Sequence, residues 1–301
     1  MPRALDSARR AFEVDPSNRE LWPRVQEIYK DAQRSADFTE LLWEAVQQQP
    51  SHETHARLTR QVAELRLSAG DQEGALEAYE AFLTQNQQVG VLAKVVELLR
   101  PSSRLADLAA RLDQLASASK GQEARDLRFE RAELLAGRLD DKETAKVELE
   151  RIVDELAPKD VLVLDRLIAL SEETGDRTRA ARAQERLLPL VETADHRADL
   201  ASGLVDTYEE LGDTDGALRV LSTWTRLDSA APNPYLRSIP LLTRLERRKE
   251  LLAAFDKLAS IAMADDEISD FTLRAARVAI EMGDHQGAWA RLLPRVTESN
   301  D

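Results

Sequence analysis

The sequence contains no cysteine and little glycine, proline or aromatic residue. Its 301 residues include 11 glycines and 11 prolines, and only 5% are aromatic. The absence of cysteine excludes disulfides, cysteine-ligated zinc and thiol nucleophiles, and nothing suggests an oxidising compartment, so we expect a cytoplasmic protein. Because the chain is poor in turn formers and rich in helix formers, it is not an all-β protein, and we expect an all-α fold.

Positive charge is also in short supply. The chain has 41 Lys and Arg against 55 Asp and Glu, a net charge of -14. General attraction to nucleic acid or to anionic lipid is therefore not expected. No run of 18 apolar residues is present, so we predict no membrane insertion. A charged partner of this chain is expected to be a basic protein or peptide.

The motifs of common catalytic sites are missing as well. There is no glycine-rich phosphate loop, no nucleophile elbow and no paired-histidine zinc motif with its general base. His52 and His55 stand three residues apart in HETH, but no third ligand is nearby, so a solvated helix start is favoured over a metal site. Adjacent carboxylates such as Glu172 and Glu173 point about 100° apart on a helix, unlike a glycosidase pair. We predict no enzyme, no cofactor and no metal.

The chain opens on Met1-Pro2-Arg3, followed by an amphipathic run from Ala4 to Val14. This run lacks the apolar core of a signal peptide. It is typical of a helix entered partway through its structural unit, so we expect the chain to be a fragment of a longer protein. Its apolar side chains are expected to cover the helix that carries Trp22.

Four Gly-Asp dipeptides mark an internal repeat. Each is followed, five residues after its glycine, by an alanine, and the intervals between them are close to three, one and two multiples of about 35 residues, a length typical of two-helix repeats. The dipeptides begin at Gly70, Gly175, Gly212 and Gly283. Weaker turn candidates fill the remaining places: Arg34-Ser35-Ala36-Asp37, Pro101-Ser102-Ser103, Asp140-Asp141 and Arg247-Arg248.

Between these turns the apolar residues recur with a helical period of about 3.6. Glycine supplies the left-handed conformation that ends one helix, and the aspartate after it caps the next. Each unit is therefore expected to be helix, tight turn, helix. The apolar stripes on the two sides of Gly212 are an example: Leu200, Leu204, Tyr208 and Leu211 before it, and Ala217, Val220, Leu221 and Trp224 after it.

This pattern resembles the tetratricopeptide repeat (TPR). The opening stretch ARRAFEVDPSN is similar to the closing half of such a repeat, with Ala8 and Ala11 as its small packing residues and Pro16 as its terminating proline. The chain departs from the family pattern at Gln26 and Glu133, where a small residue is expected. The resemblance implies an α-solenoid of about eight stacked helix-turn-helix repeats in a right-handed superhelix with a concave groove.

The resemblance extends over nearly the whole chain as a single solenoid, with the unit around 90–120 matching least. It predicts a leading half unit and eight further units: 1–17, 18–52, 53–88, 89–120, 121–158, 159–193, 194–230, 231–264 and 265–301. One hairpin cannot bury both of its apolar stripes, so neighbouring units must stack. Six aromatic residues at helical spacing are expected to fill these interfaces: Trp22, Tyr29, Trp43, Tyr79, Trp224 and Trp289.

Ligands of TPR arrays usually lie along the concave face built by the first helices. Projecting these helices gives mixed charge in the early and last units and an acidic stretch in the fifth and sixth. We predict that this stretch binds a basic segment, with a merely solvated surface as the alternative interpretation. The predicted residues are Asp165, Glu172, Glu173, Asp199, Asp206, Glu209 and Glu210, and the mixed-charge surface around Arg57 and Arg60 is the second candidate.

Two specialised relatives fit less well. The TPR subclass that grips C-terminal carboxylates uses a basic and amide clamp, and the corresponding places here include Pro23, Glu27 and Glu64. Helical repeats that read RNA need a basic groove, which the charge balance disfavours. The sequence therefore predicts a non-enzymatic protein-interaction scaffold. The alternative is an accessory or regulatory region that docks or self-associates within a larger enzyme or assembly, so homo-oligomers are compatible with this reading.

Overall fold

The computed structural model describes residues 2–48 and 51–298, so the parts of the predicted units that fall on residues 1, 49–50 and 299–301 lie outside the described residues. Within the described ranges every regular element is a helix. The α-helices are α1 (Pro2–Val14), α2 (Leu21–Asp31), α3 (Ser35–Gln47), α4 (His52–Ser68), α5 (Gln72–Gln85), α6 (Val89–Leu99), α7 (Leu105–Ala118), α8 (Gly121–Gly137), α9 (Lys142–Arg151), α10 (Val161–Glu173), α11 (Arg177–Leu187), α12 (Ala194–Glu210), α13 (Thr214–Leu227), α14 (Asn233–Arg244), α15 (Arg248–Ile261), α16 (Asp265–Glu281) and α17 (His285–Glu298). A π-helical turn, Ile152–Leu156, follows α9, and a 3-10 turn, Leu188–Leu190, follows α11.

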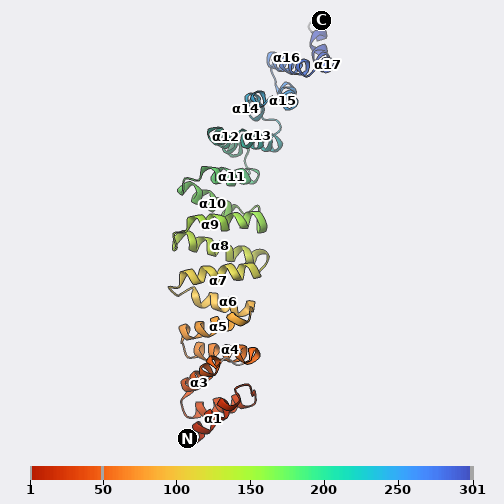
Figure 1. Ribbon diagram of the computed structural model, residues 1–301. Coiled ribbons are helices and arrows are strands. Elements are labelled where there is room, and N and C mark those ends of the chain that lie inside the picture. The colour runs from red at the N-terminus through yellow and green to blue at the C-terminus, as the bar shows by residue number, and fades with distance from the viewer. Residues whose placement is uncertain (1, 49–50, 299–301) are drawn as a thin grey trace. The chain divides into compact units, whose positions relative to one another are not determined.

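The chain forms two compact units, Met1–Ile152 and Val153–Asp301. Within each unit a helix packs chiefly against the helix before it and the helix after it, as for α4 with α5 or α12 with α13 (Figure 1). The predicted all-α fold of stacked helical hairpins is thereby confirmed in each unit. The predicted boundaries of the repeats, with α1 as the leading half unit, and their continuity in one solenoid remain a proposal.

The Gly-Asp turns close each hairpin with the same hydrogen bonds. Gly212 has a φ of 74° and donates its N–H to the carbonyl of Glu209 at 3.0 Å, while the N–H of Asp213 reaches the carbonyl of Tyr208 at 2.9 Å. The Asp213 side chain then accepts from the Gly216 N–H at 2.8 Å and caps α13. This is the Schellman motif joined to an N-cap. It recurs at Gly70-Asp71, Gly175-Asp176 and Gly283-Asp284.

The weaker turns also separate helices, although two are displaced from the predicted residues. Between α2 and α3 the left-handed residue is Gln33, with a φ of 57°, and the predicted turn residues Ser35–Asp37 begin α3. Between α14 and α15 it is Glu246, with a φ of 54°. Both sites lack glycine and keep the Schellman bonds, so a side chain occupies a backbone conformation that costs about 1–2 kcal/mol.

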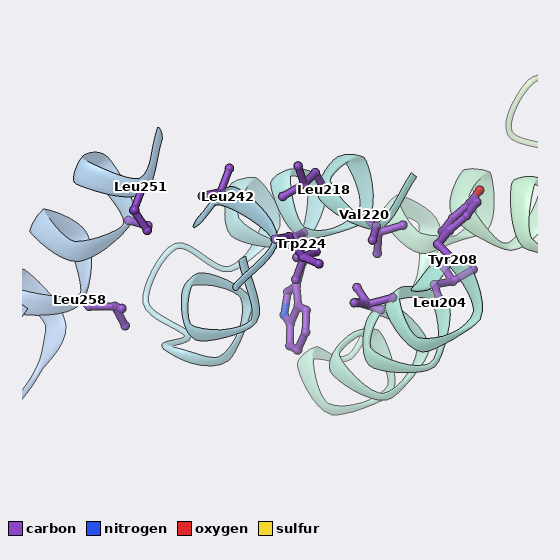
Figure 2. Close-up of a cluster of buried hydrophobic side chains, with 14 of the residues drawn as sticks. Leu204, Tyr208, Leu218, Val220, Trp224, Leu242, Leu251 and Leu258 are labelled. Atoms are coloured by element: carbon purple, nitrogen blue, oxygen red, sulfur yellow. The ribbon is translucent and has the colours of Figure 1, made fainter. Parts of the chain in front are cut away.

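Small residues and one tryptophan organise the core of the second unit. The predicted alanine is buried in all four Gly-Asp hairpins. Ala75 and Ala217 are 0% exposed, Ala288 is 3% exposed and Ala180 is 5% exposed. Trp224 lies in a cluster that joins Leu204 and Tyr208 of α12 to Leu242 of α14 and Leu258 of α15 (Figure 2). Burial of this aromatic and aliphatic surface supplies the main stabilisation of the unit.

In the first unit α1 covers the next helix as predicted. Phe12 is fully buried, and its ring lies 6.2 Å from that of Trp22 on α2. Tyr29 and Phe38 continue the contact from α2 to α3 with ring centroids 5.8 Å apart. Helix α1 is therefore part of the core of this unit.

One of the six aromatic assignments is wrong. Trp289 is 59% exposed, whereas the residues at the same place in the other Gly-Asp hairpins are buried: Leu76 at 2%, Ala181 at 1% and Leu218 at 9%. Leu218 belongs to the cluster that includes Leu242 of the following helix, α14. Trp289 therefore lies at a place that is buried in the other three hairpins and exposed in this one.

Arginine side chains join alternate helices. Each reaches a carboxylate about 30 to 35 residues earlier or later in the chain, beyond the helix in between, so each links two hairpins directly. The pairs are Arg9–Glu44, Arg100–Glu130, Arg186–Asp154, Arg219–Glu185, Arg237–Asp206 and Arg291–Asp256.

Candidate protein-binding surface

Three of the predicted acidic residues lie on the exposed side of α10. Asp160 caps the start of the helix, and its carboxylate accepts from the Val163 N–H at 3.2 Å. Its buried side carries leucines and valine, which turns Asp165, Glu172 and Glu173 to solvent. Helical periodicity thus places these three residues on the exposed side of the helix, and their position on a concave face stays a prediction.

The other four predicted residues lie on the exposed side of α12. This helix buries Ala201, Leu204, Val205 and Tyr208 against its neighbours. The opposite side presents Asp199, Asp206, Glu209 and Glu210, all exposed. We call the seven carboxylates of α10 and α12 the acidic surface.

The two helices match each other at their last turns. Glu172 and Glu209 each precede their turn glycine by three residues, and Glu173 and Glu210 precede it by two. Arg177, at the start of α11, lies between these helices in sequence and donates to Glu210 at 2.6 Å. Gln184 of α11 lies 3.4 Å from Glu172. Polar side chains of α11 thus contact the acidic side of both helices.

Arg237 is seated on the acidic surface. It belongs to α14, is about a quarter exposed, and donates to the Ser202 hydroxyl at 2.8 Å and the Ser202 carbonyl at 3.2 Å. Its other terminal nitrogen pairs with Asp206 and lies 3.3 Å from Glu209. The geometry is that of a guanidinium held by two carboxylates and a hydroxyl. Sequence reasoning missed this arginine because it comes from the following hairpin.

The second candidate surface carries two arginines with different roles. Arg60 is exposed and pairs with Glu64 one turn later at 3.1 Å. Arg57 is half-buried, lies 4.7 Å over the ring of Trp22, and donates to the Ser17 carbonyl at 2.7 Å. Burial, followed by the nearby charge of Arg19, lowers the pKa of Arg57. The Arg57 side chain therefore packs against Trp22 and Ser17 of the same protein, while the Arg60 side chain is exposed to solvent.

A further acidic groove lies in the first unit and was not predicted. It has a volume of about 490 Å³ and is lined by residues of α6, α7 and α8. Its carboxylates include Glu97, Glu123 and Asp126, and Arg100 forms a two-pronged pair with Glu130 at 2.8 Å. The spacing of Glu123, Asp126 and Glu130 on one side of α8 was the available signal. It was missed because this part of the chain matches the repeat pattern least.

A groove of the second unit lies among α13, α14 and α15. Its volume is about 640 Å³, and apolar side chains such as Leu221 and Leu242 line it. Arg247 and Glu250 lie at its edge and form a pair at 2.7 and 2.8 Å. The projection of first helices did not anticipate this groove because α13 and α15 are second helices.

The two histidines differ in exposure. His52 is exposed, as predicted for a solvated helix start. His55 is only 7% exposed, so the prediction is wrong for this residue. Across residues 2–48 and 51–298 there is no group of three or more His, Cys, Asp or Glu placed to hold a metal ion. None of the described helices is both long enough and apolar enough to cross a membrane.

Comparison with protein-family models gave no match, and comparison with curated proteins gave none either. The hairpins closed by Gly-Asp turns, each with a buried alanine at the same place, agree with the repeat pattern of the sequence. The chain is similar to tetratricopeptide-repeat proteins.

Three solved structures match this chain at low sequence identity. A tetratricopeptide repeat protein from Parabacteroides merdae shares 15% identity over 84% of this chain and 96% of its own, with a TM-score of 0.33. The Naa15/Naa10 structure bound to HypK-THB shares 14% identity over 96% of this chain, with a TM-score of 0.36. The match covers 49% of the chain in that structure. The complex of the TPR2AB domain of yeast Sti1 with pHSP90 shares 14% identity over 80% of this chain and 89% of its own, with a TM-score of 0.28.

Proposed function

We propose that this TPR-like chain is a non-enzymatic protein-interaction scaffold whose acidic surface binds a basic segment of a partner protein. The contacts of Arg237 with the acidic surface are the observation that supports this proposal. There a guanidinium of the chain itself occupies the place in which an arginine or lysine of a partner would be held, between Asp206 and Glu209. The compartment belongs to the same proposal, since a cysteine-free chain suits the reducing cytoplasm.

The electrostatics support a fast and salt-sensitive encounter. Exposed carboxylates on one face of a protein with a net charge of -14 attract cationic segments over distances comparable to the Debye length, about 8–10 Å in physiological salt. Such charges raise the association rate more than they set the final affinity. The partner is therefore a segment with several Lys or Arg residues.

Photo-crosslinking tests where such a segment binds. The probe is an octa-arginine peptide that carries a benzophenone, incubated with the full chain at low salt and mapped by mass spectrometry. Cross-links concentrated on α10, α12 and the start of α14 support the proposal. Cross-links spread over both units in proportion to exposed carboxylates contradict it.

A second candidate function is that of an accessory region which docks or self-associates within a larger assembly. Trp289 favours it, because the indole is exposed at a place where the other Gly-Asp hairpins carry buried side chains. Sedimentation velocity over a concentration series tests this candidate with Trp289→Ser. Loss of a concentration-dependent species in the variant supports self-association through α17, and a purely monomeric wild-type chain excludes it.

A further inference from the structure

The first unit contains a small cavity between α2 and α4 that the acidic surface does not involve. Its volume is about 270 Å³, and the aromatic rings of Trp22 and Phe38 form part of its wall. Pro23, two arginines and two glutamines complete the lining: Arg19, Gln26, Arg57 and Gln61. We call this the Trp22 cavity. No carboxylate is among its lining residues.

The two arginines bring positive charge that the fold only partly offsets. Arg57 lies over the indole of Trp22 and uses one terminal nitrogen on the Ser17 carbonyl, while its buried Nε has no hydrogen-bond partner among the described residues. Arg19 pairs with Glu53 at 2.5 Å, and both side chains of this pair are largely exposed. An exposed pair of this kind contributes little energy and exchanges readily with another anion.

The two amides are the second element of the cavity. Neither the Gln26 nor the Gln61 side chain makes a hydrogen bond to another described residue. Each amide carries two N–H donors that can turn toward a ligand. The cavity therefore combines cationic and neutral donors beside an aromatic wall.

We propose that the Trp22 cavity binds an anionic group, a phosphate or a carboxylate, carried on a side chain of a partner. Such a group accepts hydrogen bonds from the guanidinium groups and amides and offsets the adjacent positive charges of Arg19 and Arg57. The site is not the clamp of the carboxylate-gripping TPR subclass, since Pro23, Glu27 and Glu64 stand at places of that clamp. The chain thus recognises acidic or phosphorylated residues with its first unit.

Tryptophan indole signals in ¹H–¹⁵N NMR spectra of the full chain test this site. The chain has only 4 tryptophans, so the Trp22 indole is assigned with Trp22→Phe. The probes are N-acetyl-phosphoserine amide and N-acetyl-glutamate amide, with sodium chloride at matched ionic strength as the reference. A saturable shift of the Trp22 indole with either probe, absent with chloride, is the expected result, and the probe that binds more tightly identifies the anion.

A charge-matched pair of variants locates the anion. Gln26→Glu places a carboxylate at the cavity and should raise the dissociation constant about threefold or more by repulsion. Gln85→Glu adds the same charge on α5, away from the cavity, and should leave it unchanged. Both positions are exposed, so neither change disturbs the core. Trp22 shifts no larger than those of Trp224, or equal dissociation constants for the two variants, overturn the proposal.

Discussion

The guanidinium of Arg237, on α14, pairs with the carboxylate of Asp206, on α12, one hairpin earlier in the chain. The same nitrogen lies 3.3 Å from Glu209. Part of the negative charge that a basic partner would meet on α12 is therefore already neutralised by a side chain of this protein. A basic segment that binds as proposed would compete with Arg237 for the same two carboxylates.

Removing this competitor should strengthen binding. Arg237→Gln should tighten an octa-arginine peptide about two- to fivefold at low salt, while the free energy of unfolding changes by no more than about 1 kcal/mol, because the pair is partly exposed. Fluorescence anisotropy measures the first quantity and urea denaturation the second. Arg248→Gln removes one positive charge from the exposed side of α15 and is the matched control. Equal affinities for the two variants would show that Arg237 does not compete.

The Gly-Asp turns could be predicted from sequence and the Arg237 contact could not. Glycine favours the left-handed conformation that ends one helix, and the aspartate after it caps the next helix. Both properties are local, so Gly212 and Asp213 predict the turn by themselves. Arg237 reaches Asp206 across a whole hairpin, and that contact depends on how hairpins pack. The exposure of Trp289 could not be predicted either, since its helical spacing is that of a core residue.

The turn between α14 and α15 offers a gain in stability. Glu246 adopts a φ of 54°, which glycine adopts without strain. Glu246→Gly should therefore stabilise the second unit by about 1 kcal/mol, measured by thermal or urea unfolding. Glu246→Ala keeps a Cβ in the same conformation and should give no comparable gain. A destabilising effect of the glycine would mean that the side chain of Glu246 has a stabilising role that outweighs the strain.

Two tryptophans of the second unit should differ widely in their contribution to stability. Trp224 is buried in the cluster of Figure 2, so Trp224→Ala should cost about 3–5 kcal/mol. Trp289 is mostly exposed, so Trp289→Ala should cost about 0.5 kcal/mol or less in the monomer. Urea denaturation at a low protein concentration compares them. Similar losses for both would contradict the assignment of Trp289 as a surface residue.

His55 should make the first unit sensitive to acid. Burial, together with the charge of His52, lowers the pKa of His55 below its ordinary 6.5. The folded state therefore binds this proton at a lower pH than the unfolded state. The stabilisation is present in full above pH 6.5 and is lost as the pH falls from 6.5 toward the folded-state pKa.

Unfolding midpoints at several pH values check this. Fluorescence of Trp22 and Trp43 reports the first unit when Trp224→Phe and Trp289→Phe remove the other two indoles. When the pH falls from 7.5 to 5.5, the urea concentration at the unfolding midpoint should decrease more in the protein that keeps His55 than in the His55→Leu variant. His52→Gln, at an exposed position, should retain most of the fall. The same slope with His55→Leu would assign the acid sensitivity to other groups.

The most direct test of the account measures binding of a basic segment to the acidic surface itself. The variant Asp206→Asn, Glu209→Gln, Glu210→Gln is compared with Asp266→Asn, Glu267→Gln, Glu281→Gln, which removes the same charge from exposed positions of α16. Stopped-flow association with octa-arginine is recorded over a salt series. The account predicts that the α12 variant associates about tenfold more slowly at low salt, that the α16 variant stays close to wild type, and that the difference shrinks as salt rises. Equal rates for the two variants at low salt would contradict it.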